Sequence, residues 1–253
     1  VTAIVQQWVA NPSANYGLIL RTVNTALVEY ELGSRESSNP LKVPHLYVRW
    51  GAETPTPVPP TPSPTSTAGS YPPPPTATAT LLPTSPVTPS VTPSITPGPS
   101  PTPTATFLPT PTPGFGALII PVSRDTYLNE WSIDKNYGSA PELLVRKEGV
   151  KAALLHIPIT SVPQDEFILS AKLHLYVTER SNSGIMFASA HEVLRPWAEN
   201  TASWVLATAE AEWQASGCKQ VGVDRSGAVV DEIELNASGT WVAFDITTAV
   251  RHW

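Results

Sequence analysis

Short runs of alternating apolar and polar residues predict β-strands across residues 114–253. The clearest run is residues 171–178. In this run Lys172, His174 and Tyr176 occupy every second position between apolar residues. Because successive side chains of a strand point to opposite faces, we expect one face of this run in the core and the other in solvent.

Six further runs have the same short apolar character, and they are residues 18–21, 26–32, 46–50, 143–146, 153–157 and 241–244. Asp245 follows the last run and is placed to N-cap a short helix through Val250, because its carboxylate can accept backbone amides two or three residues on. Asn136-Tyr137-Gly138-Ser139 predicts a turn in which Gly138 is free to take a positive φ. Short strands without alternating helices predict an all-β fold, an antiparallel β-sandwich with one short helix.

Residues 54–113 interrupt this pattern. They carry no charged side chain and hold 21 of the 29 prolines, mixed with Thr, Ser and Ala. Such a segment has too little apolar surface to offset the entropy of ordering its backbone, and its Pro-Thr alternation favours polyproline II. It therefore predicts a disordered Pro/Thr/Ser stalk between two folded pieces, residues 1–53 and residues 114–253.

Charge and cysteine content exclude several classes of protein. The net charge is −6 and neither folded piece contains a cluster of Lys and Arg, which argues against nucleic acid as a partner. The single cysteine, Cys218, excludes an internal disulfide framework and a Cys-based zinc site, and a lone cysteine is usually inert. No apolar run has the length needed for membrane insertion. The Thr-Pro stalk and the scarcity of Cys and Met favour a bacterial extracellular or cell-surface protein.

A family resemblance rests on many weak motifs in a fixed order. In residues 114–253 these are Asp125-Thr126-Tyr127, Asn136-Tyr137-Gly138-Ser139, Leu143-Leu144-Val145, Ala153-Leu154-Leu155, residues 170–177, Trp197-Ala198-Glu199 with Trp204, and Gly239-Thr240-Trp241-Val242 through Phe244-Asp245-Ile246-Thr247. Together they resemble DNRLRE-type domains, which are similar to disaggregatase-related repeats and to a class of carbohydrate-binding modules. Residues 15–18, 34–36, 39–40 and 44–48 look like the C-terminal third of such a domain.

The resemblance implies a jelly-roll β-sandwich that is repeated along large secreted or surface proteins and has no catalytic role of its own. The chain departs from the family pattern at His156, where an Arg is common, and at Pro158, which interrupts a Phe-Asp-Leu segment. These departures weaken any ligand role borrowed from the family for this strand.

The best candidate for a sugar-binding site is the solvent-facing side of residues 171–178. Sugar sites combine apolar faces that stack on pyranose rings with a few polar groups that fix hydroxyls. Lys172, His174 and Tyr176 supply a cation, an imidazole and an aromatic ring, and Arg146 and His156 could extend the face from neighbouring strands. The alternative is an ordinary solvated strand face, since alternating polar residues occur on any half-buried strand.

Four tryptophans allow a second interpretation. Trp197 and Trp204 bracket an acidic loop and either form a stacking platform or serve as packing anchors, which is the commoner role of tryptophan. Trp131 and Trp213 lie in expected loops and are predicted to be exposed.

Asp125, Asn129 and Asp134 are close in sequence and offer the hard oxygen ligands of a possible calcium site. The alternative is that the two aspartates make ordinary turn and cap hydrogen bonds. No zinc-binding His spacing, nucleophile elbow or phosphate-binding glycine loop is present. The carboxylates are numerous enough to form a glycosidase-like pair by chance, so their number carries no specificity.

The sequence therefore predicts a non-catalytic carbohydrate-binding module, with polysaccharide and neighbouring repeats of the same protein as partners. A structural bead in a stalked surface protein, without a sugar ligand, is the alternative. A polysaccharide lyase or hydrolase is the weaker one.

Residues 246–253 align with residues 1–8, with identity at Thr, Val and Trp. This similarity indicates a fragment of a tandem array, in which residues 1–53 finish one copy and residues 114–253 begin the next. We expect the strands of residues 1–53 to dock into residues 114–253 and give one circularly permuted domain.

Overall fold

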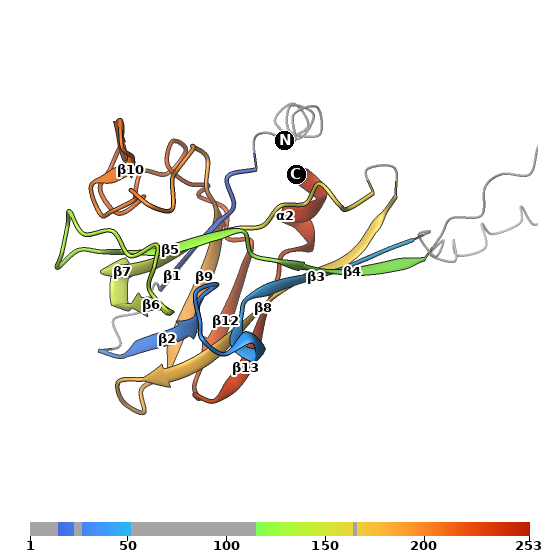
Figure 1. Cartoon of the computed structure of the whole chain (residues 1–253), viewed down its shortest axis with the longest axis horizontal. Coiled ribbons are helices and arrows are strands. Elements are labelled where there is room, and N and C mark those ends of the chain that lie inside the picture. The colour runs from blue at the N-terminus through green and yellow to red at the C-terminus, as the bar shows by residue number, and fades with distance from the viewer. Residues whose placement is uncertain (1–14, 23–26, 52–114, 164–165) are drawn as a thin grey trace, which may run out of the picture. The chain divides into compact units, whose positions relative to one another are not determined.

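The computed structural model describes residues 15–22, 27–51, 115–163 and 166–253 (Figure 1). The expected stalk and the first copy of the terminal repeat lie outside these residues. The described residues form one short α-helix, α2 (Thr247–His252), and thirteen strands. The strands are β1 (Leu18–Thr22), β2 (Glu29–Gly33), β3 (His45–Trp50), β4 (Gly116–Pro121), β5 (Arg124–Asn129), β6 (Glu142–Arg146), β7 (Lys151–His156), β8 (Ile168–Arg180), β9 (Met186–Glu192), β10 (Leu206–Thr208), β11 (Ala211–Glu212), β12 (Asp231–Leu235) and β13 (Thr240–Asp245).

Eleven of these strands form one strongly curled antiparallel sheet, and β10 and β11 form a separate pair. One half of the sheet runs β12-β9-β1-β7, with β5 on the far edge of β7, and the other half runs β6-β2-β8-β3-β4, with β13 on β8. The halves are joined where Arg146 of β6 pairs with Lys151 of β7. The structure confirms the predicted all-β antiparallel fold with one short helix. None of the described helices is long and apolar enough to cross a bilayer.

Strands that precede the proline-rich stretch are inserted between strands that follow it. β1 pairs with β7 and β9, β2 with β6 and β8, and β3 with β8 and β4. Each of the three strands of residues 15–51 is therefore bordered on both edges by strands of residues 116–253. The repeat boundaries and the circular permutation stay predictions.

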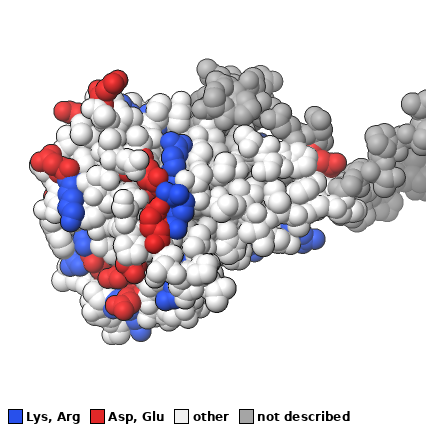
Figure 2. Space-filling view, viewed as in Figure 1, with Lys and Arg blue, Asp and Glu red and all other residues white. Residues whose placement is uncertain are grey.

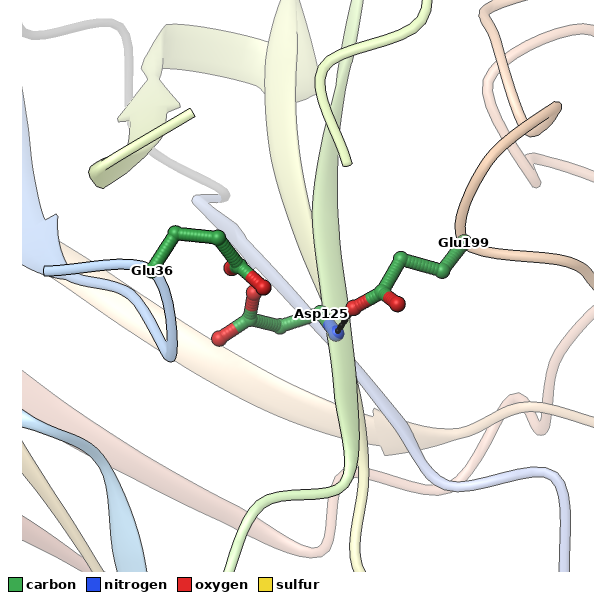
Figure 3. Close-up of side chains that lie close together, drawn as sticks. All are labelled: Glu36, Asp125 and Glu199. Carbon is green, nitrogen blue, oxygen red and sulfur yellow. Dashed lines mark hydrogen bonds between the residues drawn. The ribbon is translucent and has the colours of Figure 1, made fainter. Parts of the chain in front are cut away.

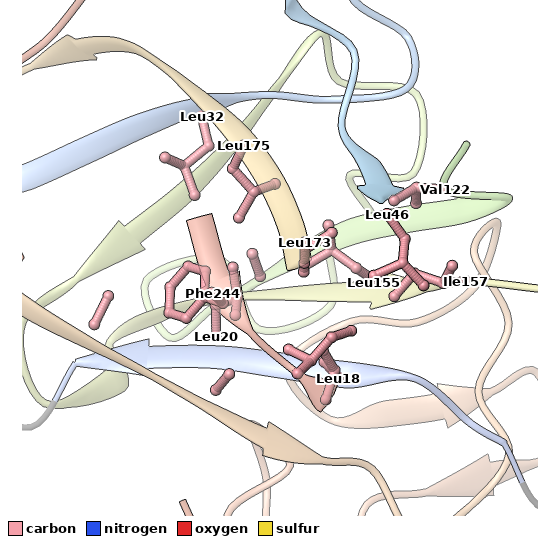
Figure 4. Packing of buried hydrophobic residues seen from close by; sticks show 14 of the residues in the cluster. Leu18, Leu20, Leu32, Leu46, Val122, Leu155, Ile157, Leu173, Leu175 and Phe244 are labelled. Atoms are coloured by element: carbon pink, nitrogen blue, oxygen red, sulfur yellow. The ribbon is translucent and has the colours of Figure 1, made fainter. Parts of the chain in front are cut away.

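The main core lies between the two halves of the sheet (Figure 4). The inward face of β8 shows the predicted alternation, because Ala171, Leu173, Leu175 and Val177 are fully buried. Aliphatic residues from both sides of the proline-rich stretch meet here, such as Leu20, Leu32, Leu46 and Leu155, together with Phe244 of β13, which is labelled beside Leu20.

A second core covers the opposite face of the β1–β7 half. There the loop segment of residues 193–218 packs Trp197, Trp204 and Trp213 against Leu154 of β7 and its neighbours. Trp197 and Trp204 are therefore packing anchors. The prediction that Trp213 is exposed is wrong, since only 4% of it is accessible, whereas Trp131 is 61% exposed. Cys218 is also fully buried in this core, and burial raises the pKa of its thiol.

Two local predictions need correction. Gly138 does not take a positive φ. It is required because a Cβ there would lie 2.3 Å from the Glu199 carbonyl oxygen, and Asn136 Nδ2 donates to that same oxygen. The helix runs from Thr247 to His252 with Ile246 at the N-cap, so Asp245 is not the N-cap residue and the helix continues past Val250. The Asp245 carboxylate still accepts the Thr247 amide two residues on.

Candidate functional site

The outer face of β3, β8 and β13 carries aromatic and imidazole side chains side by side. The sheet register places His45 opposite His174, and Trp241 opposite Tyr176. Because directly paired residues of adjacent strands point to the same face, these four side chains gather into one surface. We call His45, His174, Tyr176 and Trp241 the aromatic platform.

The platform is held by ring contacts. The imidazoles of His45 and His174 stack with their centroids 5.2 Å apart and 8° between planes. Trp241 meets His45, His174 and Tyr176 edge-on, at centroid distances of 5.2, 6.5 and 5.4 Å. Trp241 nevertheless keeps 40% of its surface exposed, so an aromatic face stays open to solvent.

A short turn before β3 forms the wall of a groove beside the platform. Residues 40–42 form a 3-10 turn that Asn39 caps by accepting the Leu41 amide. This turn, together with Val43, His45, His174 and Trp241, lines a hollow of about 690 Å³. Lys42 of the same turn does not line the hollow, and its Nζ lies 5.1 Å from the Tyr176 ring centroid. The groove thus combines apolar walls with the two imidazoles of the platform.

Packing disfavours the charged form of His174. Burial lowers the pKa of His174, and the neighbouring His45 and Lys172 lower it further. His45 Nδ1 lies 3.3 Å from the Val43 carbonyl oxygen, an acceptor that favours a proton on Nδ1. In that tautomer Nε2 of His45 is an acceptor, and a neutral His174 offers one donor and one acceptor. Imidazoles in this state suit the mixed donor and acceptor character of hydroxyl groups.

The two residues expected to extend this face lie elsewhere. Arg146 is on β6, where it pairs with Glu29 at 3.4 Å and lies 4.7 Å from the ring centroid of exposed Trp131. His156 ends β7 in the other half of the sheet, where it contacts Ser123 Oγ at 2.8 Å. Burial, with Arg124 nearby, lowers the pKa of His156 to about 4. The structure brings neither residue to the platform.

His156 instead lines a larger cleft of about 850 Å³ next to α2. Its walls include Tyr16, Arg124, Phe167 and Trp253. Arg251 also lines it, with its guanidinium 4.4 Å from the Phe167 ring and two of its nitrogens donating to the Ile168 carbonyl. Because its cations are already engaged with backbone carbonyls, the cleft has fewer free polar groups than its residue types suggest.

Three carboxylates meet at β5, where Asp125 is the direct strand partner of Leu155 of the main core (Figure 3). Glu36, Asp125 and Glu199 each place an oxygen within 4.8 Å of the others. The Arg35 guanidinium contacts Glu36 at 2.6 Å and Glu199 at 3.0 Å, and its backbone amide donates to Asp125. Burial, opposed by that amide and reinforced by Glu36 and Glu199, raises the pKa of Asp125 to about 8.

This group includes one of the three predicted calcium ligands. Asn129 is engaged elsewhere, since its side chain bonds the Tyr137 hydroxyl and the Trp131 amide. Asp134 is exposed and does not belong to the carboxylate group. Arg35 already supplies positive charge among the carboxylates, and calcium binding stays a prediction.

The chain was compared with known proteins. Residues 119–216 match the model of carbohydrate-binding module family 96. The matched residues include β8 with Lys172, His174 and Tyr176, whereas His45 and Trp241 lie outside them. Comparisons with curated proteins and with solved structures gave no match.

Residues 45–50 show the same alternation as β8, and this signal could have assigned His45 to a solvent face. Residues 241–244 are all apolar, so alternation does not distinguish Trp241 from its neighbours. The register that places both residues beside His174 and Tyr176 could not be read from alternation alone. Figure 2 adds that, on the face shown, Lys and Arg are interspersed with Asp and Glu and form no basic surface.

Proposed function

We propose that this protein is a non-catalytic carbohydrate-binding module that holds a polysaccharide on the aromatic platform. The family 96 match supports a carbohydrate ligand. The observation that carries the proposed site is a partly exposed Trp241 beside Tyr176 and two imidazoles, along a groove. Indole and phenol faces stack on the apolar faces of pyranose rings, while imidazole nitrogens bind hydroxyls.

The experiment is retention on polysaccharides in native affinity gels, first with the parent protein across a panel and then with Trp241→Ala and Tyr176→Ala. Both variants should lose retention, because they remove the stacking surface. Both should unfold within about 1 kcal/mol of the parent, because their side chains are only partly buried. A large loss of stability in Tyr176→Ala would make it a core residue and contradict its assignment to the site.

The matched control is Trp131→Ala. Trp131 is a second exposed tryptophan, 61% accessible, and lies outside the platform over Arg146. Retention should be unchanged in this variant. Loss of retention in Trp131→Ala with none in Trp241→Ala would place the site at Arg146 instead. If the parent binds no polysaccharide, the result favours the alternative of a structural bead without a sugar ligand.

The same proposal covers catalysis and location. The purified protein should release neither reducing ends nor unsaturated products from the polysaccharide it binds. Turnover that disappears when one acidic residue is changed would instead indicate a lyase or hydrolase. A polysaccharide partner and a Thr-Pro stalk support an extracellular or cell-surface protein, and detection of the native protein outside its source cells would test this location.

A further inference from the structure

We propose that residues 15–51 are a detachable three-strand unit, and that the slots it fills between strands of residues 116–253 also accept this unit from a second copy of the chain. Two copies would then complete each other by exchange of β1, β2 and β3.

The contact between the unit and the rest of the domain resembles a protein interior. Seven large side chains of the unit enter the main core with 2% exposure or less, namely Leu18, Leu20, Val28, Tyr30, Leu32, Leu46 and Val48. An interface of this apolar character is typical of obligate association. The unit is therefore not an accessory hairpin on the surface.

Backbone pairing shows that neither part has its complete sheet without the other. Among the described strands, β1, β2 and β3 pair only with strands of residues 116–253 and never with one another. Removing the unit would expose edges of β9, β7, β6, β8 and β4. Open edges with apolar faces bind further strands, and the same unit from another copy has the matching register and side chains.

The covalent connection permits both arrangements. Trp50 of β3 and Gly116 of β4 are direct partners, so residues 51–115 close a hairpin whose two ends already meet. Closing a connection of this length costs little more entropy than closing a connection of half the length. It gives the unit an effective concentration on the order of millimolar next to the rest of its own chain. Closure within one chain should dominate in dilute protein, and exchange should compete as the protein concentration approaches that value.

Exchange would also divide the platform. His45 belongs to the unit, whereas His174, Tyr176 and Trp241 belong to the rest of the domain. If the proposed sugar site is correct, a bound polysaccharide would favour the completed domain over the open one, because it binds only that form. The association tests below need no sugar and are therefore independent of the proposed function.

The first test cuts the connection in the full chain. Residues 54–113 contain no Lys or Arg, so a site for a sequence-specific protease would be inserted there. After cutting, the two pieces should elute together in native buffer at micromolar concentration and separate only in denaturant. Separation on cutting would overturn the proposal that strand pairing holds the unit.

A pair of variants on one strand sharpens this test. Leu46 is fully buried on β3, whereas Arg49 of the same strand is exposed. After cutting, Leu46→Ala should lower the denaturant concentration that separates the pieces, and Arg49→Ala should leave it unchanged. Equal effects would show that the core contacts of the unit do not hold the pieces together.

The second test measures exchange. Cut chains labelled with nitrogen-15 would be mixed with unlabelled cut chains, warmed through the unfolding midpoint, cooled and weighed by native mass spectrometry. About half of the complexes should contain one labelled and one unlabelled piece, the statistical result for free reassortment. Recovery of the two parental masses alone would overturn the detachable unit.

The intact chain should show the same process as dimers. Refolding at 100 μM should give roughly a hundredfold higher ratio of dimer to monomer than refolding at 1 μM, since closure is unimolecular and exchange is bimolecular. In a dimer of labelled and unlabelled chains with the protease site, cutting both connections should leave mixed pairs of pieces. No dimer at any concentration would overturn exchange with a second copy.

Discussion

The two halves of the curled sheet differ in what lies on the side away from the shared core. On the β1–β7 half, the segment of residues 193–218 covers the sheet with three buried tryptophans. On the β3–β8–β13 half, Trp241 lines an open groove and contacts Tyr176 edge-on. Tryptophan thus stabilises the fold on one half and is available to a ligand on the other. The difference arises because residues 193–218 cover only the first half.

The largest effect should come from breaking the covered half. Trp197 is 3% exposed, and its indole nitrogen donates to the Tyr16 carbonyl at 2.7 Å. Trp197→Ala should lower the free energy of unfolding by about 3–5 kcal/mol, because it leaves a cavity and an unpaired carbonyl. Guanidinium denaturation would measure this loss of stability. Trp241→Ala is the matched variant on the open half. An equal loss of stability in Trp241→Ala would contradict the difference between the two halves.

A smaller loss should follow from pushing the covering segment away. A Cβ on Gly138 would lie 2.3 Å from the Glu199 carbonyl oxygen, a backbone atom that cannot move aside freely. Gly138→Ala should therefore cost about 1–3 kcal/mol through strain in residues 199–202. Ser139→Ala, at the exposed neighbouring position, is the control. If Gly138→Ala and Ser139→Ala have the same denaturation midpoint, the contact between residue 138 and the Glu199 carbonyl oxygen is not tight.

The carboxylates that tie Glu199 to β5 predict a pH effect on the covered half. The pKa of Asp125 is about 8 in the folded protein, against a usual value of 3.8, so the folded state holds the extra proton between these values. Stability must then fall as the pH rises from about 4 to about 8. Asp125→Asn keeps an acceptor for the Arg35 amide without the charge, so its midpoint should rise relative to the parent across that window.

Melting curves of the parent and of Asp125→Asn, recorded in parallel from pH 4 to pH 8, would check this. A difference between the two melting midpoints that stays the same at every pH would contradict it. If calcium binds these carboxylates instead, added calcium should raise the midpoint of the parent at pH 8 and not that of Asp125→Asn.

The smallest effect should come from the open half. The pKa of His174 is lowered in the folded protein by burial and by His45 and Lys172. The unfolded chain therefore binds the proton more readily, and stability is lost as the pH falls below the unfolded value of about 6.5. His174→Gln should reduce the acid-induced fall in the melting midpoint by a small amount, because His174 is only half-buried. If the melting midpoint of His174→Gln falls with pH as steeply as that of the parent, the stacked imidazoles do not disfavour protonation of His174.

Short apolar runs predicted seven of the thirteen described strands, and alternation predicted both faces of β8, because strand geometry acts locally. The pattern did not predict strands such as β4, β5, β9 and β12. It did not predict which aromatic residues are covered. Trp213 follows a polar loop in sequence, and only the packing of residues 193–218 on β7 buries it. The platform likewise depends on the register of β3, β8 and β13, which long-range packing determines. Glu36 and Glu199 join Asp125 from distant segments for the same reason.

The direct pairing of Trp50 with Gly116 has a mechanical consequence. A pulling force applied through residues 54–113 would act on the last rung of the β3–β4 hairpin and open its backbone hydrogen bonds one after another. A force applied along the strands would have to shear all six pairs of the register at once. A force applied through the proline-rich stretch would therefore separate β4 from β3 at a low force, while most of the core remains folded.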